Sequence, residues 1–276
     1  NHAKRSGIPE RIANMVLQGE TDFSNDDYEE MTHFDDAQMT EKEIREMPKV
    51  WIIGGDGALG DIGFQNLSKV VLQNRPNVQI LMLDTQVYSN TGGQNSDSSV
   101  MPGGFDMNQF GKYHEGKLVE RKELAQIFTS GHGSPFVANV SMANAPKFFQ
   151  AVLDGLLYRG TCFIQSFTTC QPEHGGGDDT SQKQAILIRD TRGMPEFTFA
   201  PEKGETWKDL FDLKGNPRLA RDWGAKKDAD KNEYDLTIPQ WAVTEGRFRK
   251  HFYKIKDDQK VVRFEDLILR LTQNDI

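Results

Sequence analysis

The sequence predicts an α/β fold with an open, mainly parallel sheet and helices on both faces. From Lys49 onward, short apolar runs alternate with segments whose apolar residues recur at helical spacing, an order typical of parallel sheets. Two of the apolar runs also end in polar, glycine-rich stretches, and open α/β sheets bind ligands at such strand ends. We therefore expect one main core with a site at one edge of its sheet.

An acidic arm, residues 1–47, precedes this core. Residues 20–47 hold eleven Asp or Glu and only two Lys or Arg, a composition that favours a surface position. Thr40 and Glu43 have the spacing of a capping box, which predicts a short helix that ends before Pro48.

The core, residues 48–195, is predicted to alternate strands and helices. The segment from Ser89 to Gly116 is far longer than the ~2 to 6 residues that usually connect such elements, so we expect it to be functional. The expected strands are residues 50–53, 78–83, 136–140 and 161–167, and the expected helices begin near Phe64, Leu124 and Pro146.

Residues 196–276 are predicted to form a C-terminal extension with amphipathic helices that wraps the core or a neighbour. Pro239 suits the first position of one helix, with Trp241 and Phe248 on one side. The basic, aromatic run 247–254 is interpreted as a solvated helix face and not as an RNA-binding surface. The second helix has its apolar side at Phe264, Leu267, Ile268 and Leu271.

Composition excludes several classes of function. The net charge of −8 argues against nucleic-acid binding, which depends on basic side chains. No apolar stretch approaches the ~18 residues of a membrane span, and the first residues carry no secretory signal, so we expect no membrane partner and a cytoplasmic location. Cys162 and Cys170 are predicted to lie on one strand, too far apart for a disulfide.

The predicted site combines two loop sequences. The strand Trp51-Ile-Ile-Gly-Gly-Asp-Gly57 ends in two glycines around a carboxylate, so the backbone at Gly55 and Gly57 can turn tightly and approach an anion. Asp56 would then face a hard cation. The next strand runs into Asp84-Thr-Gln-Val-Tyr-Ser-Asn-Thr-Gly-Gly-Gln94, which offers oxygen ligands and backbone amides. Together they predict a site for a diphosphate and Mg²⁺.

These two stretches, with Asp61-Ile-Gly63, resemble the thiamine-diphosphate-binding domain of pyruvate:ferredoxin oxidoreductases. The resemblance covers residues 49 to 175 best. It implies a thiamine-diphosphate-binding fold in which Asp56, the Thr85 hydroxyl and the Val87 carbonyl bind Mg²⁺. It also implies that Asn90 contacts the cofactor near its diphosphate.

The resemblance further implies an activity. Carbanion chemistry at a 2-oxo acid needs an electron sink that no side chain provides, and thiamine diphosphate is that sink. The implied reaction is oxidative decarboxylation of pyruvate or a similar 2-oxo acid with coenzyme A, with ferredoxin as an electron acceptor. Cys170 resembles the last cysteine ligand of an iron–sulfur cluster, although a small apolar residue at a strand end is an open alternative. The other cluster ligands and the activating glutamate would come from other domains or subunits, and no catalytic residue is assigned in this chain.

Two further functions remain open at this point. One is a non-redox thiamine-diphosphate decarboxylase or ligase, and the other is a catalytically silent interaction subunit. His174, which precedes Gly175-Gly-Gly177, is expected to be an exposed loop residue.

Overall fold

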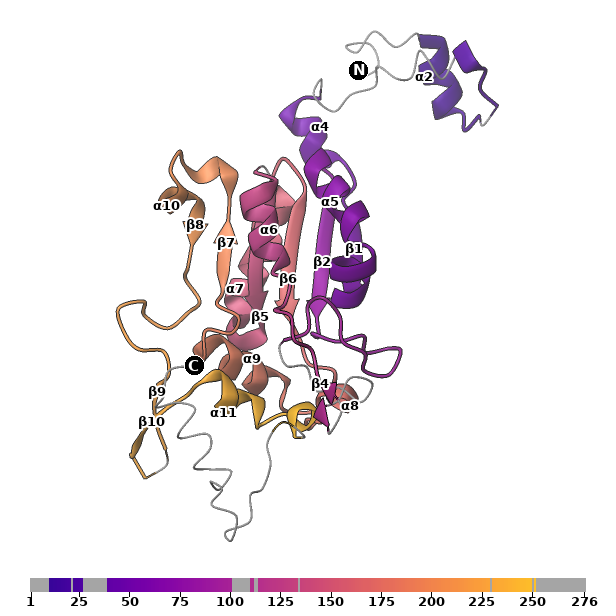
Figure 1. The fold of residues 1–276 in the computed structure, drawn as a ribbon. Coiled ribbons are helices and arrows are strands. Elements are labelled where there is room, and N and C mark those ends of the chain that lie inside the picture. Colours follow the sequence, from indigo (N-terminus) through magenta and orange to yellow (C-terminus); the bar gives the residue numbers. More distant parts are fainter. Residues whose placement is uncertain are drawn as a thin grey trace.

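The computed structural model describes residues 10–20, 22–26, 39–100, 110–111, 114–133, 135–228, 230–249 and 251. The first helices are α2 (Glu10–Leu17) and α4 (Glu41–Glu46). The predicted capping box is confirmed, because Thr40 Oγ1 accepts from the Glu43 amide at 3.3 Å and Glu43 accepts from the Thr40 amide at 2.9 Å. Figure 1 shows α2 beyond the end of the sheet at which strand β1 begins.

A six-stranded sheet forms the centre of the molecule (Figure 1), in the order β1-β2-β6-β5-β7-β8. The first four strands in that order are parallel, and β7 and β8 are antiparallel to their neighbours. The predicted open, mainly parallel sheet is therefore confirmed. The strands are β1 (Val50–Gly55), β2 (Val78–Asp84), β5 (Phe136–Ser141), β6 (Cys162–Phe167), β7 (Phe197–Phe199) and β8 (Phe211–Asp212).

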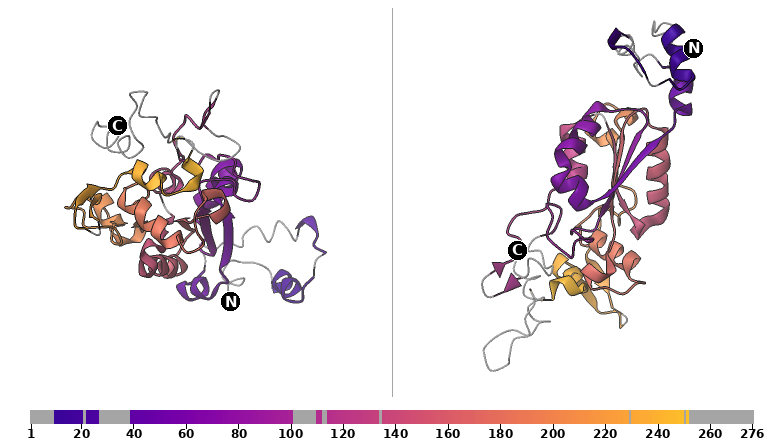
Figure 2. Two further views of the ribbon diagram at one scale, coloured as in Figure 1. Left: turned by 90° about the horizontal axis from the view of Figure 1, so that it is seen from below. Right: turned by 90° about the vertical axis from the view of Figure 1, so that its right-hand side faces the viewer.

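Helices cover both faces of the sheet (Figure 2). Helices α5 (Phe64–Gln73) and α6 (Leu124–Gly131) pack on one face through Leu67, Val71 and Phe128, all buried. Helix α7 (Ala145–Leu157) covers β5 and β6 on the other face. In α7, Phe149 is 60% exposed, whereas Phe148 packs against the buried cluster on this face.

The sheet continues past residue 195, since β7 and β8 extend it beyond β5. Helix α8 (Gln171–His174) and helix α9 (Ser181–Asp190) follow β6. Other short helices are the 3-10 helices η4 (Met142–Asn144), η5 (Pro201–Lys203) and η6 (Gly246–Phe248), and helices α10 (Trp207–Leu210) and α11 (Ile238–Ala242). Two antiparallel strand pairs lie outside the main sheet, β3 (Phe110–Gly111) with β4 (His114–Glu115) and β9 (Ala225–Lys227) with β10 (Glu233–Asp235).

The prediction that a single helix follows Pro239 and carries both Trp241 and Phe248 is wrong. Helix α11 ends at Ala242, and the chain turns before η6 begins at Gly246. Trp241 and Phe248 nevertheless meet, with ring centroids 5.5 Å apart, because the turn folds the two short helices onto each other. The second predicted helix, from Phe264, lies outside the described residues. In the part of the chain that the structure describes, no helix has both the length and the apolarity needed to cross a membrane.

Candidate cofactor site

The two predicted loops meet at the carboxyl edge of the sheet, because β1 and β2 are parallel neighbours. Asp56 follows β1 and is fully buried. Its Oδ1 accepts a hydrogen bond from Thr85 Oγ1 at 2.9 Å, and its Oδ2 accepts one from Ser96 Oγ at 2.5 Å. Thr85 Oγ1 also lies 3.0 Å from the carbonyl oxygen of Val87. The structure thus brings a carboxylate, a hydroxyl and a carbonyl together at one point.

The carboxyl group of Asp56 has a raised pKa. Burial is the main cause, followed by the negative charge of Asp84, and together they raise the pKa of Asp56 to about 6. Hydrogen bonds from Ser96 and Thr85 act in the opposite direction. The hydrogen bonds to this carboxylate come from hydroxyl groups and not from a basic side chain, and a bound cation would place an opposite charge directly beside it.

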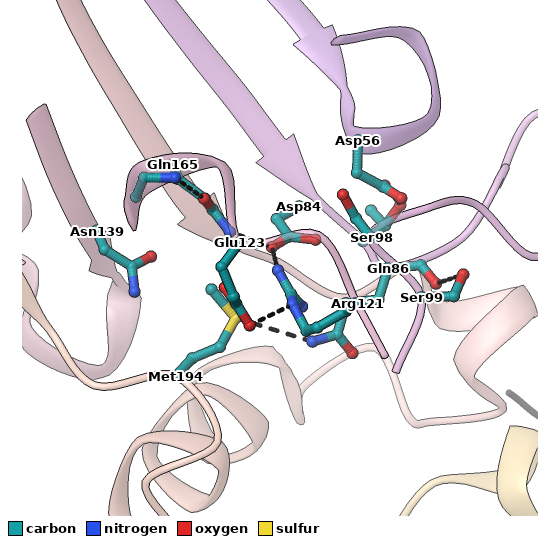
Figure 3. Close-up of polar contacts among 12 residues, drawn as sticks. Asp56, Asp84, Gln86, Ser98, Ser99, Arg121, Glu123, Asn139, Gln165 and Met194 are labelled. Carbon is teal, nitrogen blue, oxygen red and sulfur yellow. Dashed lines mark hydrogen bonds and ion pairs between the residues drawn. The ribbon is translucent and has the colours of Figure 1, made fainter. Parts of the chain in front are cut away.

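A buried ionic network lies beside Asp56 (Figure 3). Arg121 Nη2 donates to Asp84 Oδ2 at 2.6 Å, and its Nε lies 2.7 Å from Glu123 Oε1. Gln165, from the middle of β6, donates to the same Asp84 oxygen at 2.7 Å. One arginine therefore faces two carboxylates here, with Asp56 close by. This surplus of negative charge favours a divalent cation.

The two glycines around Asp56 have different surroundings. A Cβ atom at Gly57 would collide with the ring of Tyr88, whose hydroxyl donates to Asp61 at 2.8 Å and lies 3.1 Å from the Gly57 carbonyl oxygen. A Cβ at Gly55 would meet nothing within 4 Å. Gly57 is therefore required by the packing of the protein itself, whereas the space at Gly55 is open to a ligand. Burial, followed by the hydrogen bond to Asp61, raises the pKa of Tyr88 to about 12.

The remaining predicted site residues lie at the same edge of the sheet. Asn90 is exposed in the loop that follows β2. Cys170 is half-buried and lies three residues beyond the end of β6, where it precedes α8. The prediction that Cys170 lies on the same strand as Cys162 is therefore wrong. Cys162 is buried in the core, and both thiols are free, so the expected absence of a disulfide is confirmed. Burial raises the pKa of the Cys162 thiol, which keeps it protonated and unreactive.

His174 was expected to be exposed, and this prediction is wrong. The side chain is buried, and its Nε2 lies 2.7 Å from the carbonyl oxygen of Thr85. Because a carbonyl only accepts, Nε2 carries the proton. Burial, followed by the nearby charge of Arg247, lowers the pKa of His174 to about 2, so the ring is neutral. The short helix α8 carries this histidine under the loop, a placement that the loop-like sequence around it did not reveal.

Arg247 also departs from its expected solvated position. The guanidinium is buried, with its Nε 2.5 Å from Glu245 Oε2 and its Nη2 donating to Gln86 Oε1 at 2.8 Å. Sequence reasoning also assigned no role to Arg121, Gln165 or Gln86. A polar residue in the middle of an apolar strand, such as Gln165, was the one signal available for this network.

Comparison with known proteins agrees with this geometry. Residues 37–165 match the family model described as thiamine pyrophosphate enzyme, C-terminal TPP binding domain. The chain is 34% identical over 169 residues to a probable pyruvate-flavodoxin oxidoreductase of Escherichia coli, and 32% identical over 174 residues to the pyruvate:ferredoxin oxidoreductase of Moorella thermoacetica. It is 30% identical over 218 residues to the pyruvate synthase subunit PorB of Pyrococcus furiosus. Residues 37–165 are therefore similar to the C-terminal thiamine-pyrophosphate-binding domain, and the chain is similar in sequence to pyruvate:ferredoxin and pyruvate-flavodoxin oxidoreductases.

The matches cover very different shares of these relatives. They span 61% and 63% of this chain but only 14% of each of the two long oxidoreductases. For the PorB subunit, the match spans 77% of this chain and 62% of that protein. The family match ends in β6, and α8, α11 and η6 lie beyond it.

Proposed function

We propose that this chain is the thiamine-diphosphate-binding portion of a 2-oxoacid:ferredoxin oxidoreductase that decarboxylates pyruvate or a similar 2-oxo acid with coenzyme A. Other domains or subunits would supply the rest of the enzyme. The sequence likeness to the oxidoreductases and the donor set at Asp56, Thr85 and Val87 support this proposal. Electrons would leave through iron–sulfur clusters, one of them ligated in part by Cys170.

The observation that carries the cofactor assignment is the spacing of three oxygen atoms. In an octahedral shell with Mg–O distances of about 2.1 Å, neighbouring ligand atoms lie about 3 Å apart. Thr85 Oγ1 lies 2.9 Å from Asp56 Oδ1 and 3.0 Å from the Val87 oxygen. These values fit the edges of such a shell. Among the described residues no three His, Cys, Asp or Glu side chains form a metal cluster, so the proposed set relies on the hydroxyl and the carbonyl.

The chain's own residues would bind and orient the cofactor. Asp56, the Thr85 hydroxyl and the Val87 carbonyl would hold Mg²⁺ against the diphosphate, while the open space at Gly55 admits the anion and Asn90 contacts it. The bound cofactor supplies the electron sink for decarboxylation. Fixing the diphosphate at the carboxyl edge of the sheet would limit the orientations open to the rest of the cofactor.

Calorimetric titration of the full chain with thiamine diphosphate and Mg²⁺ tests the cofactor assignment. We expect the wild type to bind only when Mg²⁺ is present, and Asp56→Ala to lose at least about 100-fold in affinity because a charged ligand is removed. Asp178→Ala, an exposed aspartate in the loop after α8, is the matched control and should bind like the wild type. Equal binding by Asp56→Ala and the wild type would remove Asp56 from the proposed metal site.

The redox assignment needs the complete enzyme. On addition of pyruvate and coenzyme A, it should reduce ferredoxin as carbon dioxide is released. Release of carbon dioxide without reduction of the acceptor would instead favour the non-redox decarboxylase. Failure of the complete enzyme to bind thiamine diphosphate would favour the silent interaction subunit.

A further inference from the structure

The loop that carries the proposed cation ligands has an unusual backbone. Gln86, between Thr85 and Val87, adopts a φ of 60°, a left-handed conformation that residues other than glycine rarely take. Of the four non-glycine residues with positive φ in the described chain, only Gln86 is buried. This conformation folds the loop so that the Thr85 hydroxyl reaches the Val87 carbonyl across it. The geometry of the proposed cation site therefore depends on what holds Gln86.

Two residues of the C-terminal half bind the Gln86 side chain. Arg247 Nη2 donates to Gln86 Oε1 at 2.8 Å, across 161 positions of sequence. Gln86 Nε2 lies 3.8 Å from the sulfur of Met194. The main chain of the loop is held as well. The Gln86 carbonyl accepts from Ser99 Oγ at 2.5 Å, and the Thr85 carbonyl accepts from His174 Nε2 at 2.7 Å.

Arg247 is itself fixed in place. Its side chain is 0% exposed and pairs with Glu245, which is 1% exposed. The guanidinium also lies over the ring of Phe248, 4.5 Å from the centroid, and within 5.6 Å of that of Trp241. A charge-assisted bond from an immobilised arginine restrains its acceptor more strongly than a bond between neutral groups. Burying this ion pair has a desolvation cost. The side chain that the buried pair restrains is Gln86.

The two elements that hold the loop are joined to each other. A Cβ at Gly175, directly after His174, would lie 2.9 Å from the Cα of Gly246, and a Cβ at Gly246 would lie 3.0 Å from the Gly175 carbonyl oxygen. Two glycines thus let α8 and η6 touch through their backbones. His174 and Arg247 thus approach the loop from two elements that contact each other.

We infer that Arg247, held by Glu245, is a positioning residue that fixes the Thr85–Val87 loop in the conformation that binds the divalent cation and the diphosphate. The C-terminal segment 237–248 is then part of the cofactor site. This inference rests on the proposed function and adds to it a determinant of cofactor affinity that lies outside the matched family region, residues 37–165.

The test compares variants of the full chain by calorimetry with thiamine diphosphate and Mg²⁺, and by electron paramagnetic resonance with Mn²⁺ as the cation probe. In the double variant Glu245→Gln/Arg247→Met, no buried charge is left unpaired. We expect its affinity for the cofactor and for Mn²⁺ to fall about 10- to 100-fold, as for loss of a hydrogen bond to a charged group. Gln86→Leu, which keeps the ion pair, should lose a similar factor.

A variant that restores the acceptor for Arg247 distinguishes a positioning role of Arg247 from a general loss of stability. Gln86→Glu keeps an acceptor for Arg247 and should bind nearly as well as the wild type, whereas adding Gln86→Leu to the double variant should weaken binding no further. The matched control is Arg189→Met, which removes another largely buried arginine, paired with Asp190 at 2.9 Å. It should lower stability without changing the affinity of the folded protein.

The outcomes distinguish the inference from the proposed function. If the wild type binds no thiamine diphosphate, the proposed function fails. If the wild type binds and both Gln86→Leu and the double variant bind equally well, only the role of Arg247 is overturned. Should the double variant fail to fold, Gln86→Leu compared with Gln86→Glu decides the question by itself.

Discussion

At the scale of single residues, Asp56 serves the proposed cation site but lowers the stability of the metal-free protein when it is ionised. Burial and then the charge of Asp84 raise the pKa of Asp56 to about 6, whereas in an unfolded chain it is about 3.9. Between these values the folded protein keeps a proton that the unfolded chain has lost. The contribution of Asp56 to stability is therefore fully present below about pH 4 and is lost as the pH rises through about 6.

Asp56→Asn should consequently stabilise the metal-free protein. A shift of about two pKa units corresponds to about 3 kcal/mol, so we expect a gain of about 2 to 3 kcal/mol at about pH 8 and almost none at about pH 4. Urea unfolding in the presence of a chelator measures this difference. A gain of the same size at both pH values would show that ionisation of Asp56 is not its cause.

With Mg²⁺ and thiamine diphosphate present, the order of stability should reverse. The wild type gains binding free energy that the variant lacks, because ligand binding to the folded state adds to its stability. Asp178→Asn is the control under both conditions, since that exposed residue lies outside the site.

At the scale of elements, the turn from β1 into the π-helix η2 (Gly57–Ile62) contains one glycine that protein packing requires and follows another that leaves space for a ligand. Gly57 is covered by the ring of Tyr88, while the position of a Cβ at Gly55 is empty. The same substitution at two nearby positions should thus have different effects.

Gly57→Ala should destabilise the protein by about 1 to 3 kcal/mol, as overpacking does, because the new methyl group displaces Tyr88 and its bond to Asp61. Gly55→Ala should leave the free energy of unfolding within about 1 kcal/mol of the wild type and weaken thiamine diphosphate binding. Thermal unfolding and calorimetry on the two variants separate these effects. Loss of stability in Gly55→Ala without loss of affinity would contradict the assignment of that space to the ligand.

At the scale of the whole molecule, the proposed function calls for more cysteine ligands than this chain holds. The chain spans 14% of each of the two long oxidoreductases compared above, and it holds two cysteines, of which Cys162 is buried in the core. A [4Fe–4S] cluster usually needs four cysteine ligands. Cys170, half-buried near the carboxyl edge of the sheet, could supply only one of them.

In the complete enzyme, Cys170→Ala should reduce the iron content and the absorbance of the cluster while leaving thiamine diphosphate binding within about twofold of the wild type, since Cys170 is not among the proposed cofactor ligands. Cys162→Ala is the control. It should lower stability by about 1 kcal/mol through a small cavity and keep the iron. Unchanged iron in Cys170→Ala would support the alternative that Cys170 is a small apolar residue at the end of a strand.

The sequence by itself determined the four parallel strands of the sheet and the convergence of Asp56 with Thr85, but not the antiparallel strands β7 and β8. These follow from local periodicity and from the rule that parallel strands present their carboxyl ends at one edge. Only the tertiary structure decided that Cys170 lies beyond its strand, that His174 is buried, and that Arg247 reaches Gln86 across 161 positions. The physical reason is that burial and ionic pairing between distant segments are set by which surfaces meet when the chain folds, and no local pattern of residues records that meeting.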